Sequence, residues 1–280
     1  MRLTFLAAGL LIFLAPAWAT HSILPVRIGL PVSLFHEQYV LISDLRQYLE
    51  SQLKRPVQFV IYRTFSTIAM QLKAENLDFA WVTDYPDIQS KSKVRLLAVP
   101  LRKGRPYFTS YLIVPAYNTK TTSLLQLKGA IFVFADPGRN GSYLEVQHEL
   151  SIAGENPAQF FSKVFFTQSH HEAIKAVAVG LAQAGIVESH IWELLAQENP
   201  KLTAQTRVVA TSHEYGAPPL VANHFVNKET FNELQSVLMN MASNQTGIAL
   251  LKRLGLDGFI PGDEQIYEHI IKIRQLVDGQ

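Results

Sequence analysis

The sequence predicts an α/β protein of two lobes, each with a mixed, mostly parallel sheet, and with a cleft between them. Apolar strand patterns alternate with amphipathic helix patterns along residues 26–82 and again along residues 131–211, which favours parallel strands joined by right-handed crossovers. Two extended segments, around residues 94–114 and 207–219, separate these units and can cross between them. Because ligands of open α/β sheets bind at the carboxyl ends of strands, we expect those ends to face one shared cleft.

The first unit begins with a short strand at Val26–Leu30. A helix is expected over Tyr39–Leu53, where apolar residues recur at helical spacing until Pro56 stops the pattern. The same alternation then predicts a strand, a helix and a strand over Val57–Tyr62, Ser66–Glu75 and Leu77–Val82. Two further strands, Val94–Leu101 and Phe108–Val114, are expected to lead out of this unit.

The second unit repeats the alternation. Its expected strands are Ile131–Ala135, Val164–Thr167, Ala184–Val187 and Arg207–Thr211, and its expected helices are Tyr143–Ala153, Glu172–Val179 and Ile191–Gln197. The remainder, Leu220–Gln280, holds one strand and three helical stretches that we expect to return to the first lobe. The predicted division is lobe 1 over residues 20–109 and 215–280 and lobe 2 over residues 110–214, with hinges near residues 110–114 and 211–219.

The N-terminus has the pattern of a secretory signal peptide over residues 1–19. Arg2 precedes an apolar stretch, Leu3–Leu14, that is shorter than the ~18 residues needed to span a membrane. Pro16–Ala19 ends in a small-x-small pattern, so we expect cleavage after Ala19 and a periplasmic protein that is exported and soluble. A membrane anchor is the alternative interpretation.

Composition excludes several classes of site. The chain has no cysteine, which excludes disulfides, thiolate metal sites, a cysteine nucleophile and lipid attachment through an N-terminal cysteine. The formal net charge is +2 with both signs interspersed, so no nucleic-acid surface is expected. Nothing in the sequence indicates a cofactor.

An anion-binding loop is expected between the strand at Ile131–Ala135 and the helix after it. Gly138 and Gly141 lack a Cβ, so backbone N–H groups there can approach a ligand closely. Asn140 and Ser142 can cap the helix, whose dipole favours negative charge at this end. The alternative is a turn that merely reverses the chain, for which Asp, Pro and Gly are also common.

Six motifs in order resemble the phosphonate, phosphate and phosphite class of periplasmic substrate-binding proteins of ABC transporters, which have the type II periplasmic binding fold. They are Leu77–Trp81, Leu97–Pro100, Ser123–Gly129, Phe134–Pro137, His171–Ile174 with Gly180, and Leu254–Phe259. The resemblance covers essentially the whole chain after the signal peptide. It implies a two-lobed clamp, without enzymatic activity, that closes on a small oxyanion and delivers it to a permease.

The resemblance also implies which residues hold the anionic head group. The loop with Arg139, Asn140, Gly141 and Ser142 matches the family segment whose amides and hydroxyls bind it, although two hydroxyl positions are Gly and Arg here. Arg139 either adds a bidentate contact or is a solvated loop charge. His171 matches the family histidine that donates into the cleft, or is a simple helix-start residue, and its neighbour His170 is expected to be exposed.

Some family positions differ in the expected pocket. Phe65 stands where family members place a pocket aromatic, so a tyrosine hydroxyl is missing, with Tyr62 as a substitute. Phe108 replaces a second tyrosine, next to Tyr107. Each change removes a hydroxyl group from the position where the family has one.

The acidic residues argue against a ligand amine. Pro218 stands where aminophosphonate binders carry an acid, so an aminoalkylphosphonate is not expected, and Glu188 and Glu214 are candidate replacements. Asp84 and Tyr85 follow the strand at Leu77–Val82, where lobe 1 should contribute to the cleft. Asp84 is a candidate acceptor for a protonated oxyanion or an amine, and equally a residue that caps the turn.

The predicted function is capture of a phosphate, phosphite or phosphonate ligand by a monomer and its delivery to an ABC permease. A ligand-sensing partner of a membrane histidine kinase is an alternative that the sequence does not separate from transport. An enzyme is disfavoured because Ser142 lies in Asn-Gly-Ser-Tyr, without the frame of a nucleophile elbow. A metal site is disfavoured because the nine histidines are scattered and lack the His-Glu-x-x-His spacing.

Overall fold

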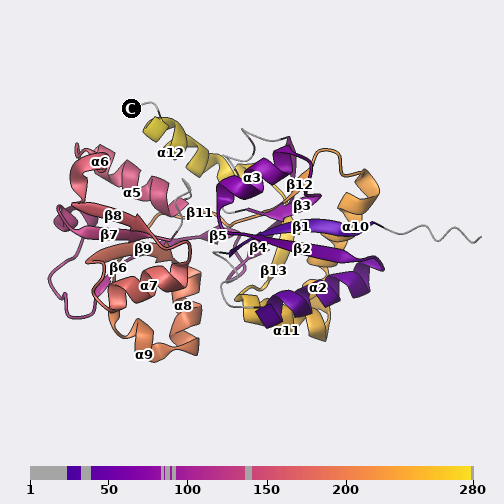
Figure 1. Ribbon diagram of the computed structural model, residues 1–280, viewed down its shortest axis with the longest axis horizontal. Helices are drawn as coiled ribbons and strands as arrows, with labels where there is room; N and C mark the ends of the chain where they lie inside the picture. Colours follow the sequence, from indigo (N-terminus) through magenta and orange to yellow (C-terminus); the bar gives the residue numbers. More distant parts are fainter. Residues whose placement is uncertain are drawn as a thin grey trace, which may run out of the picture.

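Two separate sheets and a narrow ribbon between them form the framework of the protein (Figure 1). The computed structural model describes residues 24–32, 39–82, 85, 89, 93–135 and 141–278. The expected signal peptide therefore lies outside the described residues. The strands of the two sheets come from residues 26–101 with 220–261 and from residues 110–211, so the chain passes from one sheet to the other and back.

The first sheet has six strands in the order β13-β4-β12-β3-β1-β2. β1, β2 and β3 are parallel, whereas β12 runs antiparallel to β3 and β4, and β13 runs antiparallel to β4. The carboxyl ends of the three parallel strands therefore share one edge, where Leu220 of β12 pairs with Trp81 of β3. The strands are β1 (Val26–Pro31), β2 (Val57–Tyr62), β3 (Phe79–Trp81), β4 (Val94–Leu101), β12 (Leu220–Asn223) and β13 (Gly258–Pro261).

Amphipathic helices cover this sheet on both faces (Figure 1). Thr64 caps the amino end of α3, where its hydroxyl accepts a bond from the Thr67 N–H, and α11 ends at Gly255, whose φ of +68° suits glycine. α2 and α11 pack against each other, as do α2 and α10. These helices are α2 (Tyr39–Leu53), α3 (Phe65–Lys73), α10 (Lys228–Met239) and α11 (Gln245–Leu254), with a 3₁₀ turn η2 (Met241–Ser243) before α11.

The second sheet has five strands in the order β10-β6-β9-β7-β8. β7 is parallel to β8 and β9, whereas β6 is antiparallel to both β9 and β10. Two hydrophobic clusters lie on its two faces, one of them beneath α5 and the other beneath α7. The strands are β6 (Ser110–Pro115), β7 (Ile131–Phe134), β8 (Lys163–Phe166), β9 (Ala184–Glu188) and β10 (Thr206–Thr211).

Figure 1 shows α5 and α6 on one side of this sheet and α7, α8 and α9 on the other. Ser169 caps α7 by accepting a bond from the Glu172 N–H, and Asn156 caps the short α6 in the same way. The helices are α5 (Gly141–Ile152), α6 (Pro157–Phe160), α7 (His170–Ala178), α8 (Ser189–Glu198) and α9 (Pro200–Thr203), and a 3₁₀ turn, η1 (Leu124–Leu127), precedes β7.

A two-stranded ribbon joins the sheets. It consists of β5 (Tyr107–Phe108) and β11 (Tyr215–Gly216), which pair antiparallel. Residues 110–114, one of the two expected hinges, belong to β6, which is hydrogen-bonded on both sides within the second sheet. That they act as a hinge stays a prediction. The chain leaves the second sheet only at Thr211, so the narrow part of the connection lies in the ribbon and the loops beside it.

The C-terminal helix α12 (Glu268–Asp278) corrects another expectation. After the 3₁₀ turn η3 (Glu264–Tyr267) it packs against α5 of the second lobe instead of returning wholly to the first (Figure 1). Its Ile270 and Ile273 are buried, and Leu144 of α5 belongs to the same hydrophobic cluster as the first sheet. α12 is therefore a further link between the lobes, besides the ribbon.

Candidate functional site

Four of the predicted binding residues lie at one edge of the second sheet. β7 and β9 end at this edge, and α5 and α7 begin there, which brings Gly141, Ser142, His171 and Glu188 to the same side. Ser110, the first residue of the antiparallel β6, pairs with Glu188, the last residue of β9. Helix N-termini and strand ends therefore meet, as expected for a ligand site of an open α/β sheet.

Ser142 takes part in a chain of three buried hydroxyl groups. Its Oγ lies 2.6 Å from Ser110 Oγ, which in turn lies 2.6 Å from the hydroxyl oxygen of Tyr215. All three residues are buried, and burial raises the pKa of Tyr215 well above its ordinary value. The phenol is therefore neutral at physiological pH and available as a hydrogen-bond donor.

Gly141 allows this arrangement because Tyr215 lies directly against the start of α5. A Cβ at position 141 would lie 2.8 to 2.9 Å from three ring carbons of Tyr215. Such distances are shorter than van der Waals contact, so only glycine lets the ribbon and the helix N-terminus approach this closely. Sequence reasoning found the glycine but missed Tyr215 and Ser110, because nothing in their local patterns indicates this contact.

Glu188 is enclosed by two histidines. His190 Nδ1 lies 3.2 Å from one carboxylate oxygen and His170 Nε2 lies 3.8 Å from the other, and all three residues are buried. Burial alone would raise the pKa of Glu188, but its interactions with His190 and His170 outweigh this effect and lower it. Glu188 is therefore a buried carboxylate that faces two imidazole rings.

The expectation that His170 is exposed is wrong, because its exposure is only 2%. It is the first residue of α7, and its Nδ1 accepts a hydrogen bond of 3.3 Å from the backbone N–H of Glu188. Burial lowers the pKa of His170 to about 4, although the neighbouring Glu188 acts in the opposite direction. The ring is neutral near pH 7 and carries its proton on Nε2.

His171 lines a small cavity of about 30 Å³ between the lobes. A water molecule needs roughly 10 to 15 Å³ of such space, so the cavity is only large enough for a few atoms. Its walls include Trp81, Pro100 and Leu256 from the first lobe and His171, His190 and Leu194 from the second. Residues of both lobes thus meet close to the start of α7.

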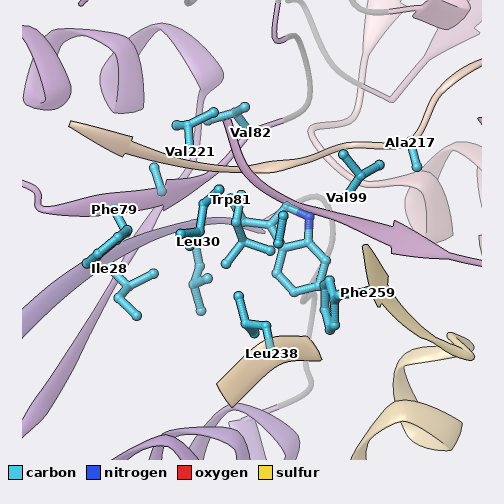
Figure 2. Packing of buried hydrophobic residues seen from close by; sticks show 14 of the residues in the cluster. Ile28, Leu30, Phe79, Trp81, Val82, Val99, Ala217, Val221, Leu238 and Phe259 are labelled. Atoms are coloured by element: carbon cyan, nitrogen blue, oxygen red, sulfur yellow. The ribbon is translucent and has the colours of Figure 1, made fainter. Parts of the chain in front are cut away.

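Trp81 anchors the side of this cavity that belongs to the first lobe. Its indole Nε1 donates a hydrogen bond of 2.8 Å to the Pro218 carbonyl, and its ring meets Phe259 edge-on with centroids 5.8 Å apart. Figure 2 shows Trp81 beside Phe259 within the packed core. On the opposite side, Phe108 of the ribbon packs against the His190 ring, with centroids 4.5 Å apart. The core thus fixes the Trp81 wall of the cavity, and the ribbon fixes the His190 wall.

Other predicted residues lie elsewhere or outside the described part. Asp84, Arg139 and Asn140 are outside the described residues, and for Phe65 only the backbone is described. Their predicted contacts with the ligand stay predictions.

The first-lobe tyrosines differ in their surroundings. Tyr85 is buried, with its ring 4.9 Å from that of Tyr267 and its hydroxyl 3.0 Å from Glu264 Oε1, to which it donates. Burial raises the pKa of Tyr85 above its ordinary value, so the phenol stays protonated. Tyr62 is half-buried at the end of β2, and burial raises its pKa as well. The contacts of Tyr85 thus go to the C-terminal segment.

Glu214, the second candidate counter-charge for an amine, forms an exposed ion pair with Arg105. The two bonds between the guanidinium and the carboxylate measure 2.5 and 2.7 Å. Arg105 lies in the loop before β5, and its guanidinium also lies over the Tyr107 ring, 5.7 Å from the centroid. This carboxylate is therefore already paired at the ribbon.

The described residues provide neither a metal-ligand cluster nor a membrane-spanning helix. No group of three His, Cys, Asp or Glu residues within them is arranged to hold a metal ion. None of the helices in the described part of the chain is long and apolar enough to cross a membrane.

Comparison with known families decides the class of the protein. The profile of the family described as "ABC transporter, phosphonate, periplasmic substrate-binding protein" matches residues 35–267. The chain belongs to this family. The phosphonate-type substrate-binding proteins are periplasmic components of ABC transporters and not enzymes, and their two-lobed type II periplasmic binding fold agrees with the fold class that the sequence predicts.

Individual relatives of the phosphonate-binding family agree with this assignment. The chain is 24% identical over 239 residues to the probable ABC transporter phosphite binding protein PhnD1 of Prochlorococcus marinus, covering 80% of each chain. It superposes with a TM-score of 0.81 and 19% identity on a binding protein component of an ABC phosphonate transporter from Pseudomonas aeruginosa, covering 91% of this chain and 87% of the other. For the PhnD1 structure in complex with methylphosphonate, the TM-score is 0.80 at 21% identity, with 91% and 98% covered.

Proposed function

We propose that this protein captures a small phosphorus oxyanion without an amine group, of the phosphate, phosphite or phosphonate class, and delivers it to an ABC permease. The observation that carries the proposal is the meeting of two helix N-termini at the edge of the second sheet. Gly141 and Ser142 begin α5 and His171 lies in the first turn of α7, next to a cavity with walls from both lobes.

The chemistry of this edge favours an anion. The first N–H groups of a helix have no partner within the helix, and the helix dipole adds positive potential at that end. Ser142 contributes a hydroxyl, and His171 an imidazole that can donate to an oxygen. The membership of the family supports a ligand of this kind and delivery to a permease.

The acidic residues support a ligand that lacks an amine. A buried ammonium group requires a counter-charge, because an unpaired charge is costly to remove from water. Glu188 is enclosed by His170 and His190, and Glu214 is paired with Arg105. The Glu188 carboxylate faces the two histidine rings, and the Glu214 carboxylate faces a guanidinium. We therefore expect an aminoalkylphosphonate to bind more weakly than an alkylphosphonate.

Closure of the two lobes would complete the site. A ligand that contacts both lobes shifts the population towards the closed form, and it does so by the difference in its affinity for the two forms. The ribbon, β5 with β11, is the narrow connection around which such a motion would occur.

A thermal-shift and calorimetry screen tests the proposal. The protein would be titrated with phosphite, methylphosphonate, phosphate, aminoethylphosphonate and sulfate. A ligand at ~100 times its dissociation constant stabilises the folded state by roughly 2.7 kcal/mol, which a thermal-shift assay detects. We expect stabilisation by at least one amine-free phosphorus oxyanion, whereas stabilisation by aminoethylphosphonate alone, or by none of these ligands, would refute the proposal.

A pair of histidine variants tests the position of the site. His171→Gln should weaken oxyanion binding by roughly tenfold or more, as expected for loss of a hydrogen bond to a charged group. His224→Gln is the matched control, because His224 follows β12 at the end where Asn223 pairs with Val94, away from the Trp81 end. Equal affinities of the two variants would remove His171 from the site.

A further inference from the structure

We propose that Tyr215 and Ser110 are positioning residues that orient the Ser142 hydroxyl so that it donates its proton to the bound anion. The inference rests on the proposed function, because it takes the N-terminus of α5 as the anion site. It adds two residues, neither of them in the predicted anion loop, that would not touch the ligand themselves. Tyr215 lies on the ribbon between the lobes, and Ser110 begins β6.

Counting protons in the hydroxyl chain leaves two possible directions. Ser110 Oγ lies between Ser142 Oγ and the Tyr215 hydroxyl, at 2.6 Å from each. Each hydroxyl has one proton, so Ser110 donates to one neighbour and accepts from the other. The protons therefore run either from Tyr215 towards Ser142 or from Ser142 towards Tyr215.

The direction from Tyr215 towards Ser142 satisfies the buried groups better. A phenol is a stronger hydrogen-bond donor than an aliphatic alcohol, and Ser110 Oγ, at 2.6 Å, is a hydrogen-bond partner of the Tyr215 hydroxyl. In the reverse direction the phenol would accept the bond from Ser110, and its own proton would lose the 2.6 Å contact with Ser110 Oγ, which is costly at a buried site. When Tyr215 donates to Ser110 and Ser110 donates to Ser142, the proton left over is that of Ser142.

The Ser142 hydroxyl proton lies at the N-terminus of α5, where we expect the anion to bind. Ser142 is the second residue of α5, so its hydroxyl lies beside the free N–H groups of the helix. An oxyanion oxygen there would accept the Ser142 proton and satisfy the last donor of the chain. Hydrogen bonds in such a chain polarise one another, so each donation strengthens the next.

The three hydroxyl groups are held in fixed positions, as preorganised hydrogen-bond donors require. The Tyr215 ring is in contact with Gly141. The backbone N–H of Ser110 donates to Ser212 Oγ at 2.8 Å, and the N–H of Ser212 donates to the carbonyl of Ser110 at 2.9 Å. The phenol and the serine therefore keep their positions before a ligand arrives.

A double-mutant cycle distinguishes this role from a structural one. Dissociation constants for methylphosphonate and phosphite would be measured by calorimetry for the wild type, Ser142→Ala, Tyr215→Phe and the double variant. Ser142→Ala should weaken binding by roughly 10- to 100-fold, and Tyr215→Phe by about fivefold, as for loss of one hydrogen bond. Because Tyr215 acts only through Ser142, the double variant should bind as Ser142→Ala does.

Tyr267→Phe is the matched control. The Tyr267 hydroxyl is also buried, and its hydrogen bond of 2.6 Å goes to the carbonyl of Ala217, directly after the ribbon, and not to the three hydroxyls of Ser142, Ser110 and Tyr215. This variant should lose stability without losing affinity. An equal loss of affinity in Tyr267→Phe and Tyr215→Phe would show that any disturbance near the ribbon weakens binding, and would overturn the inference.

The remaining outcomes separate the inference from the proposed function. If Ser142→Ala weakens binding but Tyr215→Phe does not, or if their effects simply add, the positioning role is refuted while the anion site at α5 stands. If Ser142→Ala binds as tightly as the wild type, Ser142 is not a donor to the ligand and the inference fails with it. If the wild type binds none of the oxyanions in the screen, the proposed function itself is refuted.

Discussion

Replacing Gly141 by alanine should disturb the contact between α5 and the ribbon. The added Cβ would lie 2.8 Å from Cδ2 and 2.9 Å from Cε2 and Cγ of Tyr215. Because Tyr215 is buried and hydrogen-bonded to Ser110, its ring has little freedom to move away. The strain therefore has to be relieved by a shift of the helix N-terminus or of the ribbon.

The cost follows from two opposing effects. Overpacking of this kind destabilises proteins by typically ~1 to 3 kcal/mol. Alanine is preferred to glycine by roughly 0.5 to 1 kcal/mol in the middle of a helix, but by less at the first position. The expected net loss is about 1 to 2 kcal/mol, which corresponds to a fall in Tm of roughly 2 to 8 °C for a chain of this size.

Gly258→Ala is a suitable control, because a Cβ at position 258 would meet only the Cβ of Ala242, at 3.7 Å. Thermal unfolding followed by circular dichroism would compare the two variants with the wild type. We expect the Tm of Gly141→Ala to fall and that of Gly258→Ala to stay within about 2 °C of the wild type. Equal Tm values for the two variants would refute the close contact between Gly141 and Tyr215.

Two further predictions concern charged groups. The pKa of His170 is about 4 in the folded protein against 6.5 in the unfolded chain, so the unfolded state takes up the proton first and the free energy of unfolding falls as the pH drops from about 6.5 to 4. This pKa difference corresponds to about 3 kcal/mol of unfolding free energy. The lowered pKa of Glu188 also reduces stability as the pH falls, at the acidic end of the range. The free energy of unfolding, measured with urea, should therefore depend less on pH in His170→Asn than in the wild type. An unchanged pH dependence in His170→Asn would show that His170 is not the group responsible. Glu214→Gln should change stability by less than about 1 kcal/mol, because its pair with Arg105 is exposed, and should leave the preference for methylphosphonate over aminoethylphosphonate unaltered. A changed preference in calorimetry would make Glu214 part of the ligand site.

Local pattern was sufficient to predict the longer elements, but not the short α6, α9 and β11. The predicted bounds of α2 and β2 agree with the structure, and β1 differs by one residue at its end. The alternation of these elements predicted the α/β class correctly, because helical and strand periodicities reflect which side chains face the core. Long-range pairing was harder to foresee, and the ribbon and the contact of α12 with α5 both depend on it.

The candidate site also combines residues that the sequence indicated with residues that only the structure brought together. Gly141 and Ser142 were candidates from sequence because a glycine-rich strand-to-helix loop has a local signature, and His171 was a candidate from the resemblance to the family. Tyr215 and Ser110 were missed because they lie 105 residues apart in the chain and meet only through the fold. His170 was expected to be exposed, since a polar residue at a helix start usually faces water, but here it meets the end of β9.

The sequence by itself thus determined the fold class, the order of the elements and the loop at which an anion is expected. These properties depend on periodicity, glycine and capping residues, which act over a few neighbouring positions. Only the tertiary structure decided which polar groups are buried together, such as Glu188 with its two histidines and the three hydroxyls at the start of α5. A buried polar group is stable only with partners, and the folded chain alone brings those partners together.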